Sequence, residues 1–552
     1  MSADTNARHG GNILVDALVR NGVDTLYCVP GESYLPVLDA LHDTPSIRTV
    51  VTRHEGAASN MADAYGKLTG RPGICFVTRG PGATHAANGV HTARQDSTPM
   101  ILFVGQISSE FKGREAFQEV DYVQMFSGLA KWAVEIEQID RIPEIINKAF
   151  SIAQSGRPGP VVIGLPEQVL FAHAEVPDVA AVKIARAAPD PASLPVLAEH
   201  LNRAQRPLVV LGGTGWDTPG LDALRQFVET HDLPVAASFR RQDLLDNRNR
   251  HYVGQLGLGS SPKLLERVRN ADLLLVIGSR LSETVSQSYE LLECPSPQQT
   301  MIHVHPDPQE LNRVYRADLP ILASLSLFAQ AAAMLANDQV RPWAQWTADA
   351  RADYLEHSTP PLPHPALNGV DMGAVMAHLT EVLPDDAVLT NGAGNYTVWL
   401  HRFYRYRQAA TELAPTNGAM GYGLPAAIAA KLHAPDRTVV CFAGDGCFMM
   451  YPQELATAIQ YNTPVIVIIV NNGMLGTIRM HQEREYPRRI SGTELVNPDF
   501  QMFAQSFGAH TEVVESSDDF PAAFSRAHAA GKLALIELRT DPKQITPQAR
   551  LD

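Results

Sequence analysis

The sequence predicts an α/β protein made of parallel sheets, and three observations support this fold class. Short apolar, β-branched runs recur along the chain, each followed by a Gly-rich turn and a longer amphipathic stretch. Two segments of loop-like composition separate these repeats into three regions, and the N-terminal and C-terminal regions share one pattern. Continuous apolar strands that alternate with helices are typical of parallel sheets covered on both faces.

The strongest apolar runs are predicted to be buried strands. They lie at residues 74–77, 101–104, 161–163, 208–211, 273–277, 439–442 and 465–470. A helix that contains residues 453–456 is expected to follow the sixth of these strands.

A chain of 552 residues is too long for one hydrophobic core. Residues 172–193 and 337–365 are rich in Ala, Pro and Asp and are predicted to be linkers, because such segments form strands and helices poorly. We therefore predict three domains, at residues 1–180, 190–336 and 366–552.

The N-terminal and C-terminal regions resemble each other in sequence. The N-terminal region reads ICFVTRGPG, a helical stretch and then STPMILFVG, and the C-terminal region reads VVCFAGDG, a helical stretch and then NTPVIVIIVNN. Cys75 and Thr98 are 23 positions apart, and Cys441 and Thr463 are 22 apart. Strand-turn-helix-strand units share composition by chance, but the matched Cys-Phe and Thr-Pro placements favour a duplicated domain.

The composition and net charge limit the expected cellular location and the classes of binding partner. The net charge of -14 disfavours a nucleic-acid-binding surface, which requires a basic face. The five cysteines are scattered without C-x-x-C spacing, which predicts a reducing cytoplasm rather than disulfides or zinc. The N-terminal segment lacks the apolar core of a signal peptide, and the longest apolar run is too short to span a bilayer. We expect a cytoplasmic protein with no membrane partner.

The C-terminal region contains a candidate metal and phosphate site. The buried strand predicted at residues 438–443 ends in Gly444-Asp445-Gly446, and Asn472 follows 27 positions after Asp445 at the end of the next strand. Ligands of parallel sheets bind at the carboxyl ends of strands, and the flanking glycines allow close approach to a phosphate. Carboxylate and amide oxygens suit Mg²⁺. Each motif alone is an ordinary turn signal; their joint placement predicts a metal-diphosphate site.

This pattern resembles the thiamine-diphosphate motif, G-D-G followed nearly thirty residues later by N-N. The resemblance covers the whole chain and is closest to the acetolactate-synthase-like branch, also called acetohydroxyacid synthases. The segments that carry it are NGAMGYGLPAA at residues 417–427, GRPGP at 156–160 and GREAFQE at 113–119. It implies three doubly wound parallel-sheet domains in the order pyrimidine-binding, central and diphosphate-binding.

The resemblance also implies the residues that hold the cofactor. Asp445, Asn472 and the backbone carbonyl of Met474 would bind Mg²⁺. Met420 would support the V-shaped cofactor, although a methionine is also ordinary core filling, and the carbonyl of Gly418 would accept a hydrogen bond from the 4′-amino group. The remaining cofactor-binding residues would be Gly394, Asn395, Tyr396, Gly444, Gly446, Cys447 and Leu475.

Glu55, within R-H-E-G-A-A, matches the carboxylate that activates the cofactor in this family. It would hydrogen-bond the aminopyrimidine ring and so promote removal of the thiazolium C2 proton. A glutamate that merely favours a helix N-terminus is the simpler alternative. Because Glu55 and Asp445 meet across a subunit interface in this family, the resemblance implies a homodimer or homotetramer.

On the substrate side, Gln118 matches a polar pocket residue, and Gly31 with Glu32 matches a turn facing the reacting carbonyl. His85, His91 and Gln95 follow Gly80-Pro81-Gly82 and are candidates for proton transfer, although isolated histidines are more often structural. We include Gln118, Gly31 and His85 with Glu55 as the catalytic candidates.

Three positions depart from the synthases and leave the substrate open. Leu475 and His481 match positions that shape the acceptor pocket in this family, and a Trp is frequent at the position of His481. Glu167-Gln168 stands where the synthases have a Lys-Asp near the substrate entrance. In the central region, residues 280–284 read RLSET where FAD-binding synthases have R-F-D-D-R. We therefore lean against FAD.

The sequence accordingly predicts a thiamine-diphosphate-dependent enzyme that decarboxylates a 2-oxo acid such as pyruvate and ligates the resulting enamine to a carbonyl acceptor. A C–C lyase, of the 2-hydroxyacyl-CoA or diketone-cleaving type, is the alternative, and Arg240-Arg241 would contribute to a basic groove for CoA. A nucleotide-dependent dehydrogenase is disfavoured because Gly257-Leu-Gly259 lacks the G-x-G-x-x-G order. Intact Glu55, Asp445 and Asn472 disfavour a pseudoenzyme.

Overall fold

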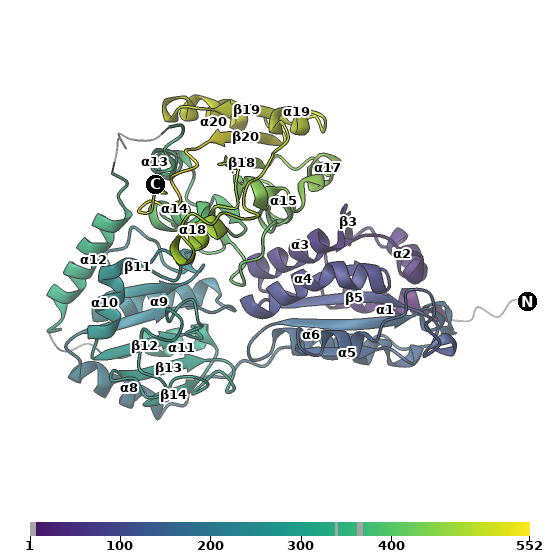
Figure 1. The fold of residues 1–552 in the computed structure, drawn as a ribbon. Helices are drawn as coiled ribbons and strands as arrows, with labels where there is room; N and C mark the ends of the chain where they lie inside the picture. The colour runs from purple at the N-terminus through teal and green to yellow at the C-terminus, as the bar shows by residue number, and fades with distance from the viewer. Residues whose placement is uncertain (1–6, 337–340, 362–367, 552) are drawn as a thin grey trace, which may run out of the picture. The chain divides into compact units, whose positions relative to one another are not determined.

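Three six-stranded parallel sheets, each flanked by helices, make up the fold and confirm the predicted fold class (Figure 1). The computed structural model describes residues 7–336, 341–361 and 368–551. These residues form two compact units. The first combines the N-terminal sheet with residues 415–435 and 451–463, and the second combines the central and C-terminal sheets.

The N-terminal sheet has the strand order β3-β2-β4-β5-β7-β6, and every pair is parallel. Its strands are β2 (Thr25–Cys28), β3 (Arg48–Val51), β4 (Gly73–Val77), β5 (Met100–Gln106), β6 (Trp132–Glu135) and β7 (Pro160–Pro166). Helices α1 (Gly10–Arg20), α2 (Leu35–His42) and α6 (Ile142–Gln154) form the apolar core on one face. Helices α3 (Glu55–Thr69) and α4 (Gly80–Asp96) pack against each other, and α15 (Gly423–His433) packs on α3.

The central sheet has the order β11-β10-β9-β12-β13-β14, the arrangement of dinucleotide-binding α/β folds. Its strands are β9 (Pro207–Leu211), β10 (Val235–Ser238), β11 (Tyr252–Leu256), β12 (Leu273–Ile277), β13 (Thr300–His305) and β14 (Leu319–Leu322). Helices α8 (Ser193–Arg203), α9 (Thr218–His231) and α11 (Leu325–Ala332) cover one face, and α10 (Pro262–Asn270) covers the other.

The C-terminal sheet has the order β16-β15-β17-β18-β20-β19. Its strands are β15 (Val388–Asn391), β16 (Glu412–Leu413), β17 (Val439–Gly444), β18 (Ile466–Asn471), β19 (His510–Val514) and β20 (Ala534–Arg539). Its helices are α13 (Met372–Val382), α14 (Tyr396–Phe403), α16 (Asp445–Phe448), α18 (Gly476–Glu485), α19 (Phe500–Gln505) and α20 (Phe520–Ala529). Numbered within each domain, its strands follow the same spatial order as those of the N-terminal sheet, which supports the predicted duplication.

Several small elements complete the part of the chain that the structure describes. They are the two-stranded pair β1 (Arg8–His9) with β8 (His173–Ala174), the helices α5 (Tyr122–Phe126), α7 (Glu167–Phe171), α12 (Ala344–Ser358) and α17 (Leu455–Gln460), and six 3₁₀ turns. The 3₁₀ turns are η1 (Glu32–Tyr34), η2 (Ser109–Phe111), η3 (Ile139–Arg141), η4 (Gln242–Leu244), η5 (Pro452–Glu454) and η6 (Ser517–Asp519).

Two sequence-based predictions need correction. The segment predicted to be a linker at residues 337–365 contains the 15-residue helix α12, although residues 337–340 and 362–367 lie outside the described residues. Its alanines favour a helix, and Ala350 and Tyr354 are buried in the central domain. The helix expected around residues 453–456 is divided into α16, η5 and α17, because Pro452 lacks the N–H that a continuous helix needs.

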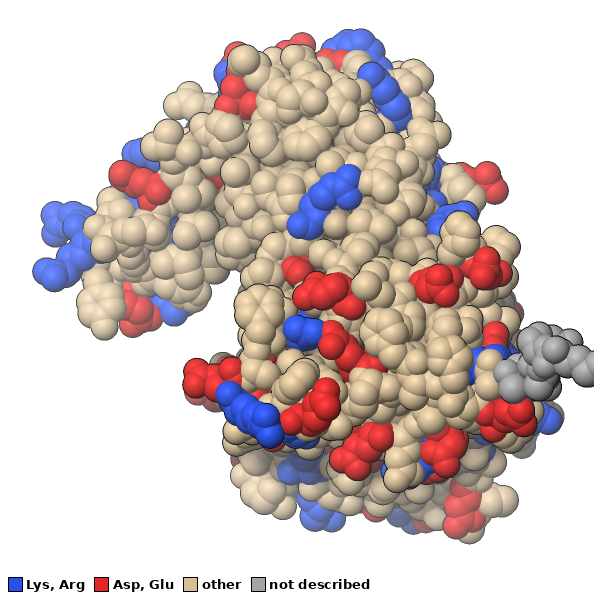
Figure 2. Space-filling view, turned by 90° about the vertical axis from the view of Figure 1, so that its right-hand side faces the viewer, with Lys and Arg blue, Asp and Glu red and all other residues tan. Residues whose placement is uncertain are grey.

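No described helix is long and apolar enough to cross a membrane. Figure 2 shows one face of the molecule, where Asp and Glu side chains are interspersed with Lys and Arg rather than replaced by a continuous basic patch.

Candidate active site

The carboxyl ends of β17 and β18 lie next to each other in the C-terminal sheet, as the sequence predicted. The two strands pair in parallel with Gly444 opposite Val470, so Asp445 and Asn472 follow adjacent strand ends. Parallel pairing places such residues at one edge of the sheet. The two motifs therefore belong to one site.

Asp445 is a buried carboxylate held by three donors. Its Oδ1 accepts from the Gly446 N–H at 2.9 Å, and its Oδ2 accepts from the Gly473 N–H at 3.0 Å and from Asn497 Nδ2 at 2.7 Å. Burial raises the pKa of Asp445, and the bonds from Asn497, Gly446 and Gly473 oppose this shift. A buried carboxylate with a raised pKa is a suitable environment for a divalent cation, which would compensate the buried charge.

Asn497 is a site residue that the sequence interpretation missed. Its Nδ2 also donates to Asn471 Oδ1 at 3.0 Å, so one side chain fastens the ends of both strands. Asn497 lies 52 positions after Asp445 and precedes a proline. That dipeptide signals a turn, but nothing in its spacing connects it with the metal site.

The other proposed metal ligands lie directly after β18. Asn472 Oδ1 accepts from the Met474 N–H at 3.2 Å, and the Met474 carbonyl accepts from the Gly476 N–H at 3.0 Å. Each of these oxygens keeps a second lone pair for a cation. Leu475 N donates to the Thr493 carbonyl at 2.8 Å, so residues beyond α18 fix the shape of this loop.

The second predicted diphosphate turn follows β15 in the same sheet. The ring of Tyr396 lies against both Gly394 and Gly444, and a Cβ on either glycine would come within 2.9 Å of it. The Tyr396 hydroxyl accepts from the Gly392 N–H at 3.0 Å and donates to Cys447 Sγ at 3.3 Å. Asn395 is fixed by Thr477, whose hydroxyl donates to Asn395 Oδ1 at 3.0 Å and accepts from the Asn395 N–H at 2.9 Å.

These contacts test whether the residues fit a diphosphate with its metal. The ring of Tyr396 fills the space beside Gly394 and Gly444, the buried Asp445 supplies a carboxylate, and the helix α16 begins at Asp445. The donor set consists of hard oxygens, which Mg²⁺ prefers. The residues fit the group that the sequence predicted.

Glu55 is the first residue of α3 in the other compact unit, and His85 lies beside it. The carboxylate Oε2 is 2.8 Å from His85 Nδ1, and the ring of His85 stacks on that of His54 with centroids 4.5 Å apart. The Glu55 side chain is 13% exposed and that of His85 is 52% exposed, so the pair is reachable from solvent. Burial lowers the pKa of His54, and the neighbouring His85 lowers it further.

Glu454, also missed by the sequence interpretation, anchors the turn that leads to Glu55. The Arg53 N–H donates to Glu454 Oε1 at 3.1 Å and to Oε2 at 3.3 Å, and the Thr457 hydroxyl donates to Oε2 at 2.6 Å. Burial raises the pKa of Glu454 to about 7, and the bonds from Thr457 and Arg53 oppose this shift. Its place in Gln-Glu-Leu-Ala gave no local signal, because its partner lies 401 positions away.

Gly31 and Gln118 occupy constrained positions in the same unit. A Cβ on Gly31 would lie 2.5 Å from Cβ of Thr78, so only glycine fits. Gln118 has φ of 65°, which is rare for a residue with a side chain. Its buried Oε1 has no hydrogen-bond partner among the described residues. Buried polar atoms are nearly always paired, so this one is available for a ligand.

The turn that carries Gly418 and Met420 also belongs to this unit. Gly418 has φ of 73°, and the Ala419 N–H donates to Asn417 Oδ1 at 3.1 Å. Asn417 Nδ2 lies 3.2 Å from His91 Nδ1, so His91 supports the turn rather than pairing with Glu55. Met420 is half-buried.

The remaining candidates lie elsewhere. Gln95 is exposed on the last turn of α4. His481 is exposed on α18 and pairs with Arg484 at 3.1 Å. Glu167 accepts from Arg79, so the position that lacks the expected lysine is occupied by an internal ion pair.

Comparison with known proteins identifies the family. Residues 8–125 match the thiamine pyrophosphate enzyme N-terminal TPP binding domain, residues 195–332 the central domain and residues 392–538 the C-terminal TPP binding domain.

Relatives over most of the chain agree with this match. The acetolactate synthase large subunit of Parasynechococcus marenigrum is 34% identical over 90% of this chain and 82% of its own length. The large subunit of acetolactate synthase isozyme 3 of Escherichia coli is 32% identical over 90% of this chain and 88% of its own length. The large subunit of isozyme 2 from the same organism is 31% identical over 93% of this chain and 92% of its own length. The chain therefore belongs to the thiamine-diphosphate-dependent enzymes, in the branch that contains the large subunits of acetolactate synthase.

Proposed function

We propose that this protein decarboxylates a small 2-oxo acid, with pyruvate as the first choice, and joins the remaining fragment to a carbonyl acceptor to give acetolactate or a related product. The observation that carries the proposal is the pair of buried turns around Asp445 and Tyr396 in a chain related to acetolactate synthases throughout. The alternative of a C–C lyase is not favoured, because these relatives are synthases.

Mg²⁺ would be held by Asp445, Asn472 and the carbonyl of Met474. When bound, thiamine diphosphate supplies a carbon nucleophile that attacks the ketone and accepts the electrons left when carbon dioxide departs. The two Gly-rich turns around Gly394 and Gly444 would hold the diphosphate. Asn497 would keep the Asp445 carboxylate oriented through its hydrogen bond to Asp445 Oδ2.

Glu55 would act on the cofactor as a carboxylic acid, whose O–H would donate a hydrogen bond to a nitrogen of the aminopyrimidine ring. His85, 2.8 Å from that carboxylate, is positioned to exchange the proton with solvent. Its more exposed ring would link the half-buried Glu55 to water. Gln118 and the Gly31 backbone are proposed to orient the substrate carbonyl.

The central domain is proposed to work without FAD, since only the Arg of the R-F-D-D-R segment is retained at Arg280. His481 and Glu167 differ from the residues frequent in acetohydroxyacid synthases, so we propose pyruvate rather than 2-oxobutyrate as acceptor. The domain boundaries at residues 1–180, 190–336 and 366–552 are likewise proposed.

We propose a cytoplasmic homodimer or homotetramer with each active site formed by two subunits. Five free cysteines, four of them buried, support a reducing compartment. Family membership supports the shared site.

Turnover of pyruvate tests the proposal. Purified protein with thiamine diphosphate and Mg²⁺ is given pyruvate, and carbon dioxide and acetolactate are followed by NMR. Acetolactate should form, and its formation should stop when EDTA removes the Mg²⁺. Absence of turnover with pyruvate and with other small 2-oxo acids would refute the proposed reaction, and an absorbance scan of the same sample tests for flavin.

The variant Glu55→Gln tests the activation step alone. It should bind the cofactor as the wild type does but lose exchange of the thiazolium C2 proton with deuterium. Unchanged exchange would show that Glu55 has no role in activation.

A further inference from the structure

A chain of three buried hydrogen bonds joins the central domain to both diphosphate turns. Arg240 Nη2 donates to the Gly392 carbonyl at 2.9 Å, the Gly392 N–H donates to the Tyr396 hydroxyl, and Tyr396 donates to Cys447 Sγ. Cys447 directly follows Gly444-Asp445-Gly446, so these bonds run from the turn after β10 of the central sheet to the proposed metal-binding turn.

Arg240 itself occupies an unusual position. It is 3% exposed, and its φ of 59° lies in the left-handed region that residues with side chains seldom adopt. Its guanidinium stacks on the Phe239 ring, 4.8 Å from the centroid. Strained backbone persists where surrounding contacts overdetermine it, and such positions gather at functional sites.

The buried acid Glu412 interacts electrostatically with Arg240. Burial raises the pKa of Glu412 to about 8, Asp243 raises it further, and the cations Arg240 and Arg241 lower it. Glu412 in turn accepts from the Gln242 N–H at 2.7 Å. The arginine and this acid thus lie in one buried polar layer where the central sheet meets the C-terminal sheet.

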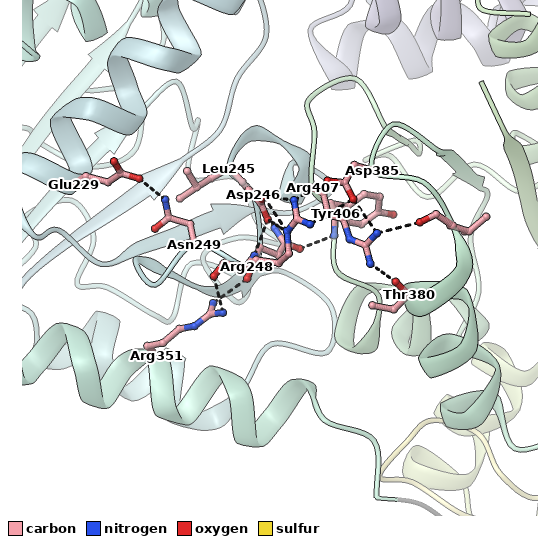
Figure 3. Close-up of polar contacts among 12 residues, drawn as sticks. Glu229, Leu245, Asp246, Arg248, Asn249, Arg351, Thr380, Asp385, Tyr406 and Arg407 are labelled. Carbon is pink, nitrogen blue, oxygen red and sulfur yellow. Dashed lines mark hydrogen bonds and ion pairs between the residues drawn. The ribbon is translucent and has the colours of Figure 1, made fainter. Parts of the chain in front are cut away.

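A second set of contacts joins the same two domains, and Figure 3 shows part of it. Arg248 reaches Asp385 at 2.8 Å, and this exposed carboxylate is also held by Arg407 of its own domain at 3.0 Å. The Tyr406 N–H donates to Asn247 Oδ1 at 2.9 Å. These contacts hold the domains together, whereas Arg240 contacts the diphosphate turn itself.

We propose that Arg240 is a positioning residue for the thiamine diphosphate site, through which the central domain sets the affinity for the cofactor. By fixing the Gly392 carbonyl, its guanidinium orients the backbone of residues 392–396 for the diphosphate. Its buried positive charge also favours an anion at the turn. The inference rests on the proposed function only in that the chain binds this cofactor.

Cofactor affinity distinguishes this role from a purely structural one. Arg240→Gln and Arg240→Lys are compared with the wild type and with Arg248→Ala, which removes an exposed ion pair between the same two domains. The dissociation constant for thiamine diphosphate at saturating Mg²⁺ is measured from the fluorescence of the protein, since Trp399 lies on the helix α14 that begins at Tyr396. Thermal unfolding of each cofactor-free variant is recorded beside it.

Arg240→Gln should raise the dissociation constant about tenfold to hundredfold, the range of one charge-assisted hydrogen bond. Arg240→Lys should lie between this variant and the wild type, because it keeps the charge but not the planar donors. Arg248→Ala should stay within about twofold of the wild type. Turnover at saturating cofactor should change far less than affinity in all three variants.

Equal affinity in Arg240→Gln and the wild type would overturn the inference, and so would an equal loss in Arg248→Ala. If Arg240→Gln does not fold, the comparison of Arg240→Lys with Arg248→Ala decides by the same criterion. Failure of the wild type itself to bind thiamine diphosphate would instead refute the proposed function.

Discussion

At the residue scale, the catalytic region of the first unit depends on carboxylates in contrasting environments. Glu55 is reachable from solvent beside His85, whereas Glu454 is fully buried and both of its carboxylate oxygens accept from the Arg53 N–H. The buried acid therefore positions the turn that presents the accessible one.

Glu454 gives a pH-dependent contribution to stability. Burial raises its pKa from 4.5 to about 7, so the folded state binds this proton more tightly than the unfolded state. The stabilisation is complete below pH 4.5 and is lost as pH rises through about 7. This difference corresponds to on the order of 3 kcal/mol.

The variant Glu454→Gln should remove that dependence while keeping an acceptor for the Arg53 N–H. The free energy of unfolding of wild type and variant is measured by urea denaturation from pH 4 to pH 9, a window chosen to bracket about 4.5 to 7. The wild type should lose stability relative to the variant as pH rises. Parallel curves would contradict the assignment, and other titrating groups cancel in the difference.

At the element scale, the two diphosphate turns are held together by one aromatic ring. Tyr396 at the start of α14 packs on Gly394 and on Gly444 at the end of β17. The glycines are needed here because a Cβ would collide with the ring, rather than because a loop must be mobile.

Gly444→Ala tests this packing. The added Cβ would meet Tyr396 Cδ1 at 2.9 Å, which should cost about 1–3 kcal/mol and weaken binding of thiamine diphosphate. Gly128→Ala is the matched control, because nothing lies within 4 Å of its Cβ position. The free energy of unfolding and the affinity for thiamine diphosphate are measured for both variants. Equal values for the two variants would show that the Tyr396 ring shifts at little cost.

A buried ion-pair cluster joins α3, α4 and the segment before α15. Lys67 lies 2.9 Å from Asp63 and also contacts Asp96, and these side chains are at most 2% exposed. The Tyr422 hydroxyl donates to Asp63 at 2.7 Å, and the Thr416 N–H donates to Asp96 at 2.7 Å. The cluster fixes the turn that contains Gly418 and Met420.

Lys67→Met should destabilise the protein by about 3–5 kcal/mol, because it leaves two buried carboxylates without their cation. Arg71→Ala, which removes an exposed pair with Asp24, should cost no more than about 1 kcal/mol. Denaturant midpoints of both variants provide the measurement. Similar midpoints would mean that the cluster contributes little beyond its hydrogen bonds.

At the scale of the whole molecule, we propose that two subunits form each active site. Glu55 and Asp445 belong to different compact units of the chain, and each unit carries its own share of the chemistry. A subunit that lacks Glu55 should therefore complement one that lacks Asp445.

Mixing the inactive variants Glu55→Gln and Asp445→Asn tests the shared site. Random exchange in a dimer makes half of the molecules mixed, and one of their two sites is intact, so about a quarter of wild-type activity should return. Activity of the mixture is followed after unfolding and joint refolding, with each variant refolded alone as its control. No recovery despite mixed dimers would place both residues in the same subunit's site.

The sequence alone determined the parallel-sheet class, the residues that follow the carboxyl ends of β17 and β18, and the cofactor family. These depend on local apolar runs, on glycines and on fixed spacings between motifs. It misassigned α12 because the neighbouring prolines obscured a short helix whose buried side chains pack on distant strands. Only the tertiary structure revealed Asn497, Glu454 and the contact of Arg240 with Gly392, since each joins segments far apart in the chain. Such partners are chosen by packing and by the satisfaction of buried polar groups, which no local pattern records.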